Sequence, residues 1–271
     1  MSLRIISGVT GAVFAATVLL LNKEFLFLIN FLVALIALVS MVEIFNALGM
    51  AKLNYITVST VIFVTILPIT GYGIIWETFL YFYTILILGI AIFNSQFKMQ
   101  NIALVYMLAV IITVSLNKII EIRFLDEKLG GFYALLALGT AWTSDTGAYF
   151  CGKFWGQKKL CPEISPKKTI EGVIGGVFVC ALSLILMGFI FNDLVFYNKY
   201  NINYILLVFM GITGSLISAL GDLCFSAIKR SCHIKDFGNV IPGHGGILDR
   251  FDSAIFVVPY VYLFLKMFPI I

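Results

Sequence analysis

Residues 172–192 read GVIGGVFVCALSLILMGFIFN and carry no charged side chain. A transmembrane helix needs about 20 consecutive, mainly apolar residues, so this stretch is long and apolar enough to cross a bilayer. Working outward from it, the same criterion gives nine candidate spans along the chain. They are residues 5–21, 25–47, 54–74, 76–94, 100–117, 131–151, 172–192, 203–226 and 251–270.

Two of these spans have unusual features. Residues 5–21 are similar to the apolar part of a signal peptide, but further apolar spans follow at once, so we interpret them as a retained first membrane helix. Pro68 and Gly71 interrupt the third span, and membrane helices tolerate such interruptions. The number of helices between residues 54 and 94 therefore stays open.

The composition points to the same class of protein. Of the 271 residues, 61% are hydrophobic and 12% are charged, against about 25% charged residues in a typical soluble domain. This composition and a mean hydropathy of +1.04 exclude a soluble globular protein. A net charge of +4 is too small to predict a nucleic-acid partner. Five cysteines without a C-x-x-C pair indicate neither a disulfide framework nor a zinc site.

Basic residues fix the orientation through the positive-inside rule. With nine spans, one side of the membrane carries the N-terminus and the links after spans two, four, six and eight. Twelve lysines and arginines fall on that side and six on the other, which predicts a cytoplasmic N-terminus. Two long basic links, residues 152–171 and 227–250, then face the cytoplasm together and can build one site.

We therefore predict an all-α polytopic membrane protein, with about nine transmembrane helices in one bundle. No repeat or linker divides the sequence, which predicts a single integral membrane domain over residues 1–271. Polar residues concentrate in the second half. Residues 1–130 are therefore predicted to be mainly scaffold helices, and residues 131–271 to hold the helices and cytoplasmic links that carry the chemistry.

Three carboxylates lie inside predicted spans and away from the first residues of those spans, where an ionisable side chain is costly and therefore a functional candidate. They are Glu43, Asp145 and Asp222, each toward the cytoplasmic end of its helix. For Glu43 we favour a structural role, in which it pairs with a basic residue or caps a neighbouring helix. For Asp222 we favour a functional role because of the residues that follow it.

The link after span eight reads KRSCHIKDFGNVIPGHGGILDRFD from Lys229 to Asp252. Asp222, Ser226 and Lys229 are spaced i, i+4 and i+7 and therefore share one helix face. Oxygen ligands such as Asp222, Asp249 and Asp252 suit Mg2+, and the lysines and arginines beside them suit a polyphosphate. A charged loop that contacts anionic lipid headgroups explains the same composition, and that alternative stays open on composition alone.

A glycine-rich turn, residues 242–246, lies within this link. Its glycines allow close backbone approach, so that amides at the start of the ninth helix can face phosphate oxygens. For His244 three roles are open: a phosphate donor, a general acid, or a residue that holds the turn by hydrogen bonding.

The link after span six carries a second group of polar residues. Asp145 and Tyr149 are i, i+4 neighbours, and a turn at residues 165–166 is expected to present Lys167 and Lys168. Other residues of this region have structural interpretations. The positive-inside anchors are Lys153, Lys158 and Lys159. The packing glycines, which let helices approach closely, are Gly172, Gly175 and Gly176.

At these residues the sequence resembles the phosphatidate cytidylyltransferase family, also called CDP-diacylglycerol synthases. The family's C-terminal signature is similar to S-x-(apolar)-K-R-x4-K-D-x-(small)-x2-(apolar)-P-x-H-G-G-(apolar)-x-D-R-x-D. The chain matches it at Ser226, Lys229, Arg230, Lys235, Asp236, Gly238, Pro242, His244, Gly245, Gly246, Asp249, Arg250 and Asp252. Two further family segments, D-x-x-A-Y-x-x-G-(R/K)-x-x-G and S-P-x-K-(S/T)-x-E-G, are matched over 145–156 and 165–172.

The resemblance implies a Mg2+-dependent nucleotidyltransferase that joins CTP to phosphatidate, giving CDP-diacylglycerol and pyrophosphate for phospholipid biosynthesis. Whether a second cation shares the site stays open. The resemblance also implies a homodimer among the lipids of a bacterial inner (cell) membrane, with its active site facing the cytoplasm. In this interpretation Asp222 and Asp249 bind the metal. The catalytic residues are Asp222, Asp249, Lys229 and Asp145. The substrate-binding residues are Lys167, Lys168, Ser226, Arg230, Lys235, Asp236, His244, Arg250 and Asp252.

Other functions stay open beside this one. The chain could act on another lipid phosphate, or it could be a CTP-dependent polyprenol kinase, which attacks the gamma-phosphorus and releases CDP instead of pyrophosphate. A transporter or channel fits the hydropathy equally well and explains intramembrane carboxylates as an ion path. A transport function leaves the dense run of charged residues from Lys229 to Asp252 without a purpose.

Overall fold

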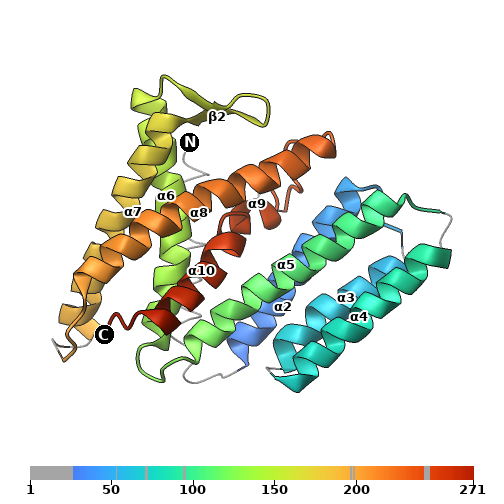
Figure 1. Cartoon of the computed structure of the whole chain (residues 1–271), viewed down its shortest axis with the longest axis horizontal. Coiled ribbons are helices and arrows are strands. Elements are labelled where there is room, and N and C mark those ends of the chain that lie inside the picture. Colours follow the sequence, from blue (N-terminus) through green and yellow to red (C-terminus); the bar gives the residue numbers. More distant parts are fainter. Residues whose placement is uncertain are drawn as a thin grey trace. The chain divides into compact units, whose positions relative to one another are not determined.

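The computed structural model describes residues 27–52, 54–70, 73–93, 96–195, 197, 199–240 and 245–271 (Figure 1). The predictions for residues 5–21 and for Pro242, Gly243 and His244 lie outside this part of the chain. The described residues separate into two compact units. One unit contains those up to Ile120 together with Cys232–Arg250, and the other contains Glu121–Ser231 together with Phe251–Ile271.

Apolar helices make up most of the first unit. α2 packs on α3, and α3 packs on α4. Between the last two, Tyr83 stacks on Phe63 with ring centroids 4.0 Å apart, and its hydroxyl lies 3.0 Å from that of Thr60. Pro68 does not break α3, because it lies in the last turn of the helix, and its carbonyl accepts a hydrogen bond from Asn30 at 2.7 Å. The helices are α2 (Leu28–Ala47), α3 (Tyr55–Thr70), α4 (Ile74–Phe93) and most of α5 (Met99–Arg123).

The second unit contains four long helices and a hairpin. α7 contacts both α6 and α8, and α10 packs on α6 and α8. A short helix, α9 (Leu248–Phe251), includes the boundary between the units. The elements of the second unit are α6 (Gly130–Trp155), β1 (Lys159–Cys161), β2 (Ser165–Thr169), α7 (Ile170–Ile190), the π-helical segment η1 (Phe191–Val195), α8 (Tyr204–Ser231) and α10 (Ala254–Met267).

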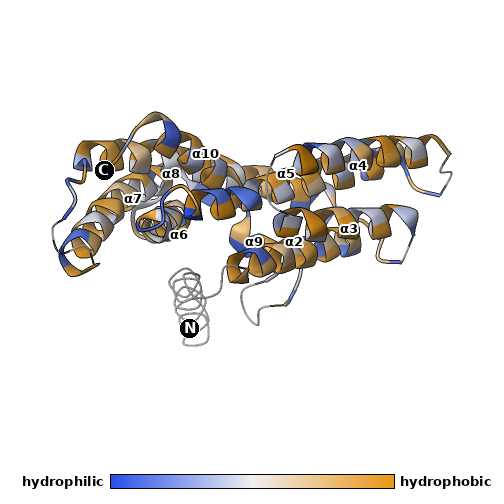
Figure 2. Cartoon of the chain, turned by 90° about the horizontal axis from the view of Figure 1, so that it is seen from below, coloured by the Kyte–Doolittle hydropathy of each residue, from blue (hydrophilic) through white to orange (hydrophobic). Residues whose placement is uncertain are grey.

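Helix α7 shows the side-chain distribution of a helix in lipid. Its exposed side includes large apolar residues at every fourth position, whereas its buried positions are mostly small. A soluble helix would bury the large residues and expose polar ones, so this distribution fits a bilayer as the surrounding solvent. The exposed series is Ile174, Phe178, Leu182, Leu186 and Ile190. The buried residues are Gly172, Gly176, Cys180, Leu184 and Gly188. Figure 2 shows that apolar residues dominate the other long helices too.

Eight helices of the described chain correspond to the predicted spans two to nine. Five of them are long and apolar enough to cross a membrane, by length and composition: α2, α4, α5, α7 with η1, and α8. α3 is apolar but shorter, with 16 residues. The chain is therefore an all-α membrane protein. The count of nine spans stays a prediction.

The glycines near the start of α7 lie at close contacts with α6, as predicted. A Cβ atom on Gly176 would lie 2.9 Å from the carbonyl oxygen of Ser144, and one on Gly172 would lie 2.8 Å from that of Ala148. A Cβ on Gly175 would overlap the side chain of Cys151. These contacts hold the start of α7 against the C-terminal half of α6.

A β-hairpin between α6 and α7 replaces the predicted turn at residues 165–166, and this prediction was wrong. Residues 165–166 begin β2, which pairs antiparallel with β1, and the turn lies at residues 162–164. The start of α7 anchors the hairpin. The Glu171 carboxylate accepts the backbone N–H of Gln157 and Lys158 at 3.0 and 3.1 Å, and the Thr169 hydroxyl caps α7 by accepting from Gly172 N at 3.1 Å.

Candidate active site

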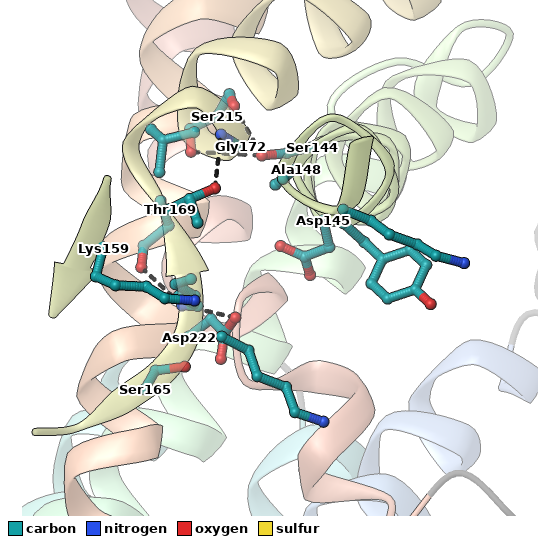
Figure 3. A pocket seen from close by; sticks show the side chains of 16 residues that line it. Ser144, Asp145, Ala148, Lys159, Ser165, Thr169, Gly172, Ser215 and Asp222 are labelled. Carbon is teal, nitrogen blue, oxygen red and sulfur yellow. Dashed lines mark hydrogen bonds and ion pairs between the residues drawn. The ribbon is translucent and has the colours of Figure 1, made fainter. Parts of the chain in front are cut away.

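A pocket of about 560 Å3 lies in the second unit, between the hairpin and helices α6, α7 and α8 (Figure 3). Most of its polar side chains come from the two motif segments that follow span six. Asp222 on α8 completes the lining from a part of the chain that is distant in sequence. The polar side chains that line the pocket are Ser144, Asp145, Tyr149, Lys153, Lys159, Ser165, Lys167, Lys168, Thr169, Ser215 and Asp222.

Lys168 and Asp222 form an ion pair in this pocket. The Lys168 ammonium lies 2.7 Å from Oδ2 of Asp222, and the two side chains are 20% and 29% exposed. The hairpin orients Lys168, because the side chain leaves β2 one residue before the N-cap of α7. The Ser226 hydroxyl donates to Oδ1 of Asp222 at 3.3 Å, one helical turn away. The prediction that Asp222 and Ser226 share a helix face is therefore confirmed.

Asp145 is held by two serine hydroxyls. Ser218 of α8 donates to Oδ1 at 3.0 Å, and Ser253, next to the start of α10, donates to Oδ2 at 2.5 Å. Both oxygens of the carboxylate are therefore fixed by neighbours from other helices. Such pairing is what a polar group in a membrane helix requires.

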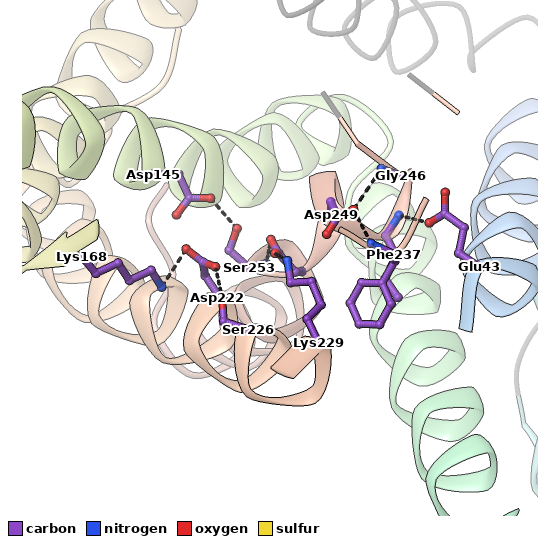
Figure 4. A network of polar contacts seen from close by, with 12 residues as sticks. Glu43, Asp145, Lys168, Asp222, Ser226, Lys229, Phe237, Gly246, Asp249 and Ser253 are labelled. Carbon is purple, nitrogen blue, oxygen red and sulfur yellow. Dashed lines mark hydrogen bonds and ion pairs between the residues drawn. The ribbon is translucent and has the colours of Figure 1, made fainter. Parts of the chain in front are cut away.

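A second ion pair joins Lys229 and Asp252. Their closest charged atoms are 3.7 Å apart, and the side chains are only 10% and 9% exposed. Figure 4 labels Lys229 of this pair and the neighbouring Ser253. Asp252 also accepts the backbone N–H of Ser253 at 2.8 Å. Because Ser253 holds Asp145, residues 252 and 253 connect this ion pair to Asp145.

The second unit therefore gathers three carboxylates and two lysines in one cluster. Asp222 acts electrostatically on both Asp145 and Asp252. Among the described residues, no group of three or more His, Cys, Asp and Glu side chains is arranged to hold a metal ion. Mg2+ usually takes only one or two carboxylates and fills its other positions with water and phosphate oxygens. The carboxylate oxygens of this cluster are donors of the kind that Mg2+ prefers.

The first unit has a carboxylate site of its own, around the loop that leads into α9. Oδ2 of Asp249 accepts the backbone N–H of both Phe237 and Gly246, each at 2.9 Å. Glu43 accepts the backbone N–H of Ile247 and Leu248, also at 2.9 Å. Glu43 therefore caps a neighbouring helix, which is the contact that its structural interpretation predicts.

The remaining predicted residues lie at different places. Lys167 lines the pocket. Arg230 points instead to the hairpin, where its Nε donates to the carbonyl of Ile164 at 3.3 Å. Lys235, Asp236 and Arg250 are exposed in the first unit. Asp222 and Asp249 belong to different units, so their shared metal site stays a prediction.

Several residues that line the pocket or hold one of its side chains were not predicted as site residues. Lys153 and Lys159 were interpreted as membrane anchors, but both line the pocket. Ser218 and Ser253 were not singled out, although both hold Asp145. Position offers a faint signal: Ser218 is one helical turn before Asp222, and Ser253 directly follows the last aspartate of the C-terminal motif.

The helices and this pocket define an integral membrane protein with a polar pocket lined by lysines and carboxylates. A family model described as "Cytidylyltransferase family" matches residues 2–268. The chain belongs to the cytidylyltransferase family.

Curated relatives are similar over part of their length. A protein of Bacillus subtilis (strain 168) named phosphatidate cytidylyltransferase is 40% identical over 186 residues, which are 69% of this chain and 64% of that protein. Proteins of the same name from Staphylococcus haemolyticus (strain JCSC1435) and Staphylococcus aureus (strain COL) are 46% and 47% identical over 136 residues, half of each chain. The aligned parts therefore span between half and 64% of these relatives.

Proposed function

We propose that the chain transfers the cytidylyl group of CTP to phosphatidate, giving CDP-diacylglycerol and pyrophosphate. Membership of the cytidylyltransferase family and the printed names of the relatives support this activity. The observation that carries it is the pocket in which Lys168 is paired with Asp222 beside Asp145. Such a pocket suits a reaction between two phosphate-bearing substrates.

The reaction needs charge neutralisation more than a base. In it, a phosphate oxygen of phosphatidate forms a bond to the alpha-phosphorus of CTP, and the bond from that phosphorus to the bridging oxygen of pyrophosphate breaks. The attacking oxygen is already anionic, so no strong general base is required. The difficulty is to bring two polyanions together in line, which cationic side chains and fixed dipoles overcome.

Different residues of the second unit neutralise charge and keep the site in place. Lys153, Lys159 and Lys167 at the pocket supply positive charge for phosphate oxygens. Lys168 is held in place by Asp222 and points a fixed ammonium group into the same pocket. Asp145 is held by two serines and does not need to reorganise during the reaction.

Asp222 and Asp249 are the proposed metal ligands, as the family resemblance implies. A bound Mg2+ would supply neutralisation of the charge on the reacting phosphates. Ser226 donates to Asp222, and the pair of Lys229 with Asp252 holds the end of the same helix. We keep the predicted catalytic role for Lys229 and the predicted substrate-binding roles for Ser226 and Asp252. We propose the same substrate-binding roles as before for Arg230, Lys235, Asp236, His244 and Arg250.

The placement in the cell is proposed from charge and from the relatives. Twelve basic residues against six favour a cytoplasmic N-terminus and a pocket that faces the cytoplasm. The relatives are bacterial proteins, which favours a bacterial inner membrane. A site at a cytoplasmic helix end lets the lipid enter sideways while CTP arrives from water. We propose that the working form is a homodimer.

The activity is tested with purified protein in detergent, supplied with CTP, phosphatidate and Mg2+. We expect pyrophosphate release that depends on phosphatidate and stops when EDTA is added. Diacylglycerol, which lacks the phosphate, is the matched control lipid and should give no pyrophosphate. Release of CDP without pyrophosphate would show a kinase instead. Flux across proteoliposomes without any product from CTP would show a transporter.

A further inference from the structure

Glu43 is an acidic residue in the apolar helix α2 of the first unit. Its side chain is almost fully buried, with 3% of the residue exposed. A carboxylate at such a position is costly unless several donors compensate its charge. The hydrogen-bond donors to Glu43 therefore indicate the role of this residue.

The donors to Glu43 are backbone amides of the loop before α9. Oε1 accepts the N–H of Ile247 and Oε2 accepts the N–H of Leu248, each at 2.9 Å. Each oxygen therefore holds one of two successive peptide groups, which fixes both the position and the direction of the loop. One carboxylate thus ties a scaffold helix to a segment about two hundred residues further along the chain, since the two hydrogen bonds span 204 and 205 positions.

Two glycines make room for this carboxylate. A Cβ atom on Gly238 would lie 2.5 Å from Oε1 of Glu43, and a Cβ on Gly246 would lie 2.5 Å from both carboxylate oxygens. Real side chains do not tolerate such distances, so the backbone approaches Glu43 only because both residues are glycine. This contact gives a physical reason for two small residues in the C-terminal motif.

The same loop holds Asp249. Oδ2 of Asp249 accepts the N–H of Gly246 and of Phe237, each at 2.9 Å. Gly246 therefore lies between the two carboxylates: its N–H binds Asp249, and its Cα faces Glu43. A shift of the loop away from Glu43 would move the donor that orients Asp249.

We propose that Glu43 is a positioning residue for Asp249: it fixes the loop 245–248 and, through it, the orientation of the Asp249 carboxylate. The contact itself is independent of the activity. The catalytic consequence rests on the proposed function, in which Asp249 is a metal ligand. Neighbours that orient a metal ligand typically contribute about 10–100-fold to metal affinity or activity.

Glu43→Gln is the decisive variant, because it keeps the shape but replaces one acceptor oxygen with an N–H2 group that faces a backbone N–H. Ser40→Ala is the matched control, since Ser40 is a buried polar residue one turn earlier on α2. Purified wild type and both variants are compared in detergent. Hydrogen exchange of the intact protein is read out on a proteolytic fragment that covers residues 237–250, and turnover is measured per folded molecule. Exchange of α2 itself and elution from a sizing column report folding.

In Glu43→Gln we expect the backbone amides of residues 246–248 to exchange hydrogen faster than in wild type. Turnover should fall by about 10–100-fold, and the exchange rates of α2 should stay unchanged. Ser40→Ala should match wild type in both. A merely structural role would lower the yield of folded protein but leave turnover per folded molecule unchanged. The proposal would be overturned if loop exchange and turnover of Glu43→Gln both lay within about twofold of wild type, a difference too small to indicate coupling.

Two further outcomes are also decisive. If Glu43→Gln does not fold, wild-type exchange is decisive: the amides of residues 247 and 248 must be protected, and rapid exchange there overturns the proposal. If wild type shows no cytidylyl transfer, the proposed function fails, whereas faster loop exchange in Glu43→Gln still supports the contact with Glu43.

Discussion

The ammonium group of Lys168 lies 2.7 Å from Oδ2 of Asp222. Lys168 belongs to strand β2 and Asp222 to helix α8, so the pair joins two segments that are far apart in the sequence. The pair is partly exposed to the pocket and is not enclosed in a core. An ion pair that is accessible to a ligand can exchange its partners when a phosphate or a cation binds.

Lys168→Ala should lower turnover by about 100-fold, because removal of one positioned donor to a developing charge usually costs 100- to 1,000-fold. Lys158→Ala is the matched control. It changes a lysine of the same link whose side chain does not line the pocket. Initial rates of pyrophosphate release test both variants. Equal losses in the two variants would assign the effect to general surface charge.

Ser253→Ala should destabilise the protein by about 1–3 kcal/mol, because Oδ2 of the partly buried Asp145 loses its donor. Turnover should fall as well, since Asp145 is then free to rotate. Thr146→Ala is the control, because Thr146 is exposed and bonds only within its own helix turn, to the carbonyl of Trp142. Thermal unfolding in detergent compares the two. A lower Tm for Thr146→Ala than for Ser253→Ala would contradict the role given to Ser253.

Gly176→Ala should destabilise the packing of α6 on α7 by about 1–3 kcal/mol, the usual cost of overpacking. The added methyl group would lie 2.9 Å from a backbone carbonyl, which cannot move aside like a flexible side chain. Gly89→Ala in α4 is the matched control: among the described residues, no atom beyond its own stretch of helix lies within 4 Å of the added methyl group, and alanine favours a helix by about 1 kcal/mol. Opposite shifts in Tm are expected. Stabilisation by Gly176→Ala would refute the close packing.

Lys229→Met should cost about 3–5 kcal/mol, since it leaves the buried carboxylate of Asp252 without its ion-pair partner. The double variant Lys229→Met with Asp252→Asn should recover part of that loss. Such recovery measures the coupling between the two residues directly. Denaturant unfolding of the single and double variants is the measurement. Strictly additive losses would show that the pair contributes nothing.

The helices could be predicted from the sequence because the length of an apolar run is set by the membrane. The eight spans from 25–47 to 251–270 each correspond to a helix within a few residues at most boundaries, although α8 continues to Ser231 and so carries Lys229 on its last turn. The capping role of Glu43 could also be predicted as a class of contact. Its partners could not, since nothing local in α2 indicates residues 247 and 248.

Other features were beyond local reasoning. Ser165-Pro166 is typical of a turn, but here these residues begin a strand. They do so because the segment pairs with β1 and because the Glu171 carboxylate accepts the backbone N–H of Lys158. Neither Ser218 nor Ser253 belongs to a pattern that indicates a contact with Asp145. They gain a role only because helix packing brings them to Asp145. Lys159 shows the same limit, because a basic residue at a membrane surface has two explanations until its surroundings are known.

The most direct test of the account follows the label from CTP into lipid. Purified protein is incubated with phosphatidate, Mg2+ and CTP that carries 32P at either the alpha or the gamma position, and the lipid is extracted. We predict alpha label in CDP-diacylglycerol, gamma label only in aqueous pyrophosphate, and neither transfer when EDTA is present. Gamma label in the lipid, or no lipid label from either nucleotide, would contradict cytidylyl transfer.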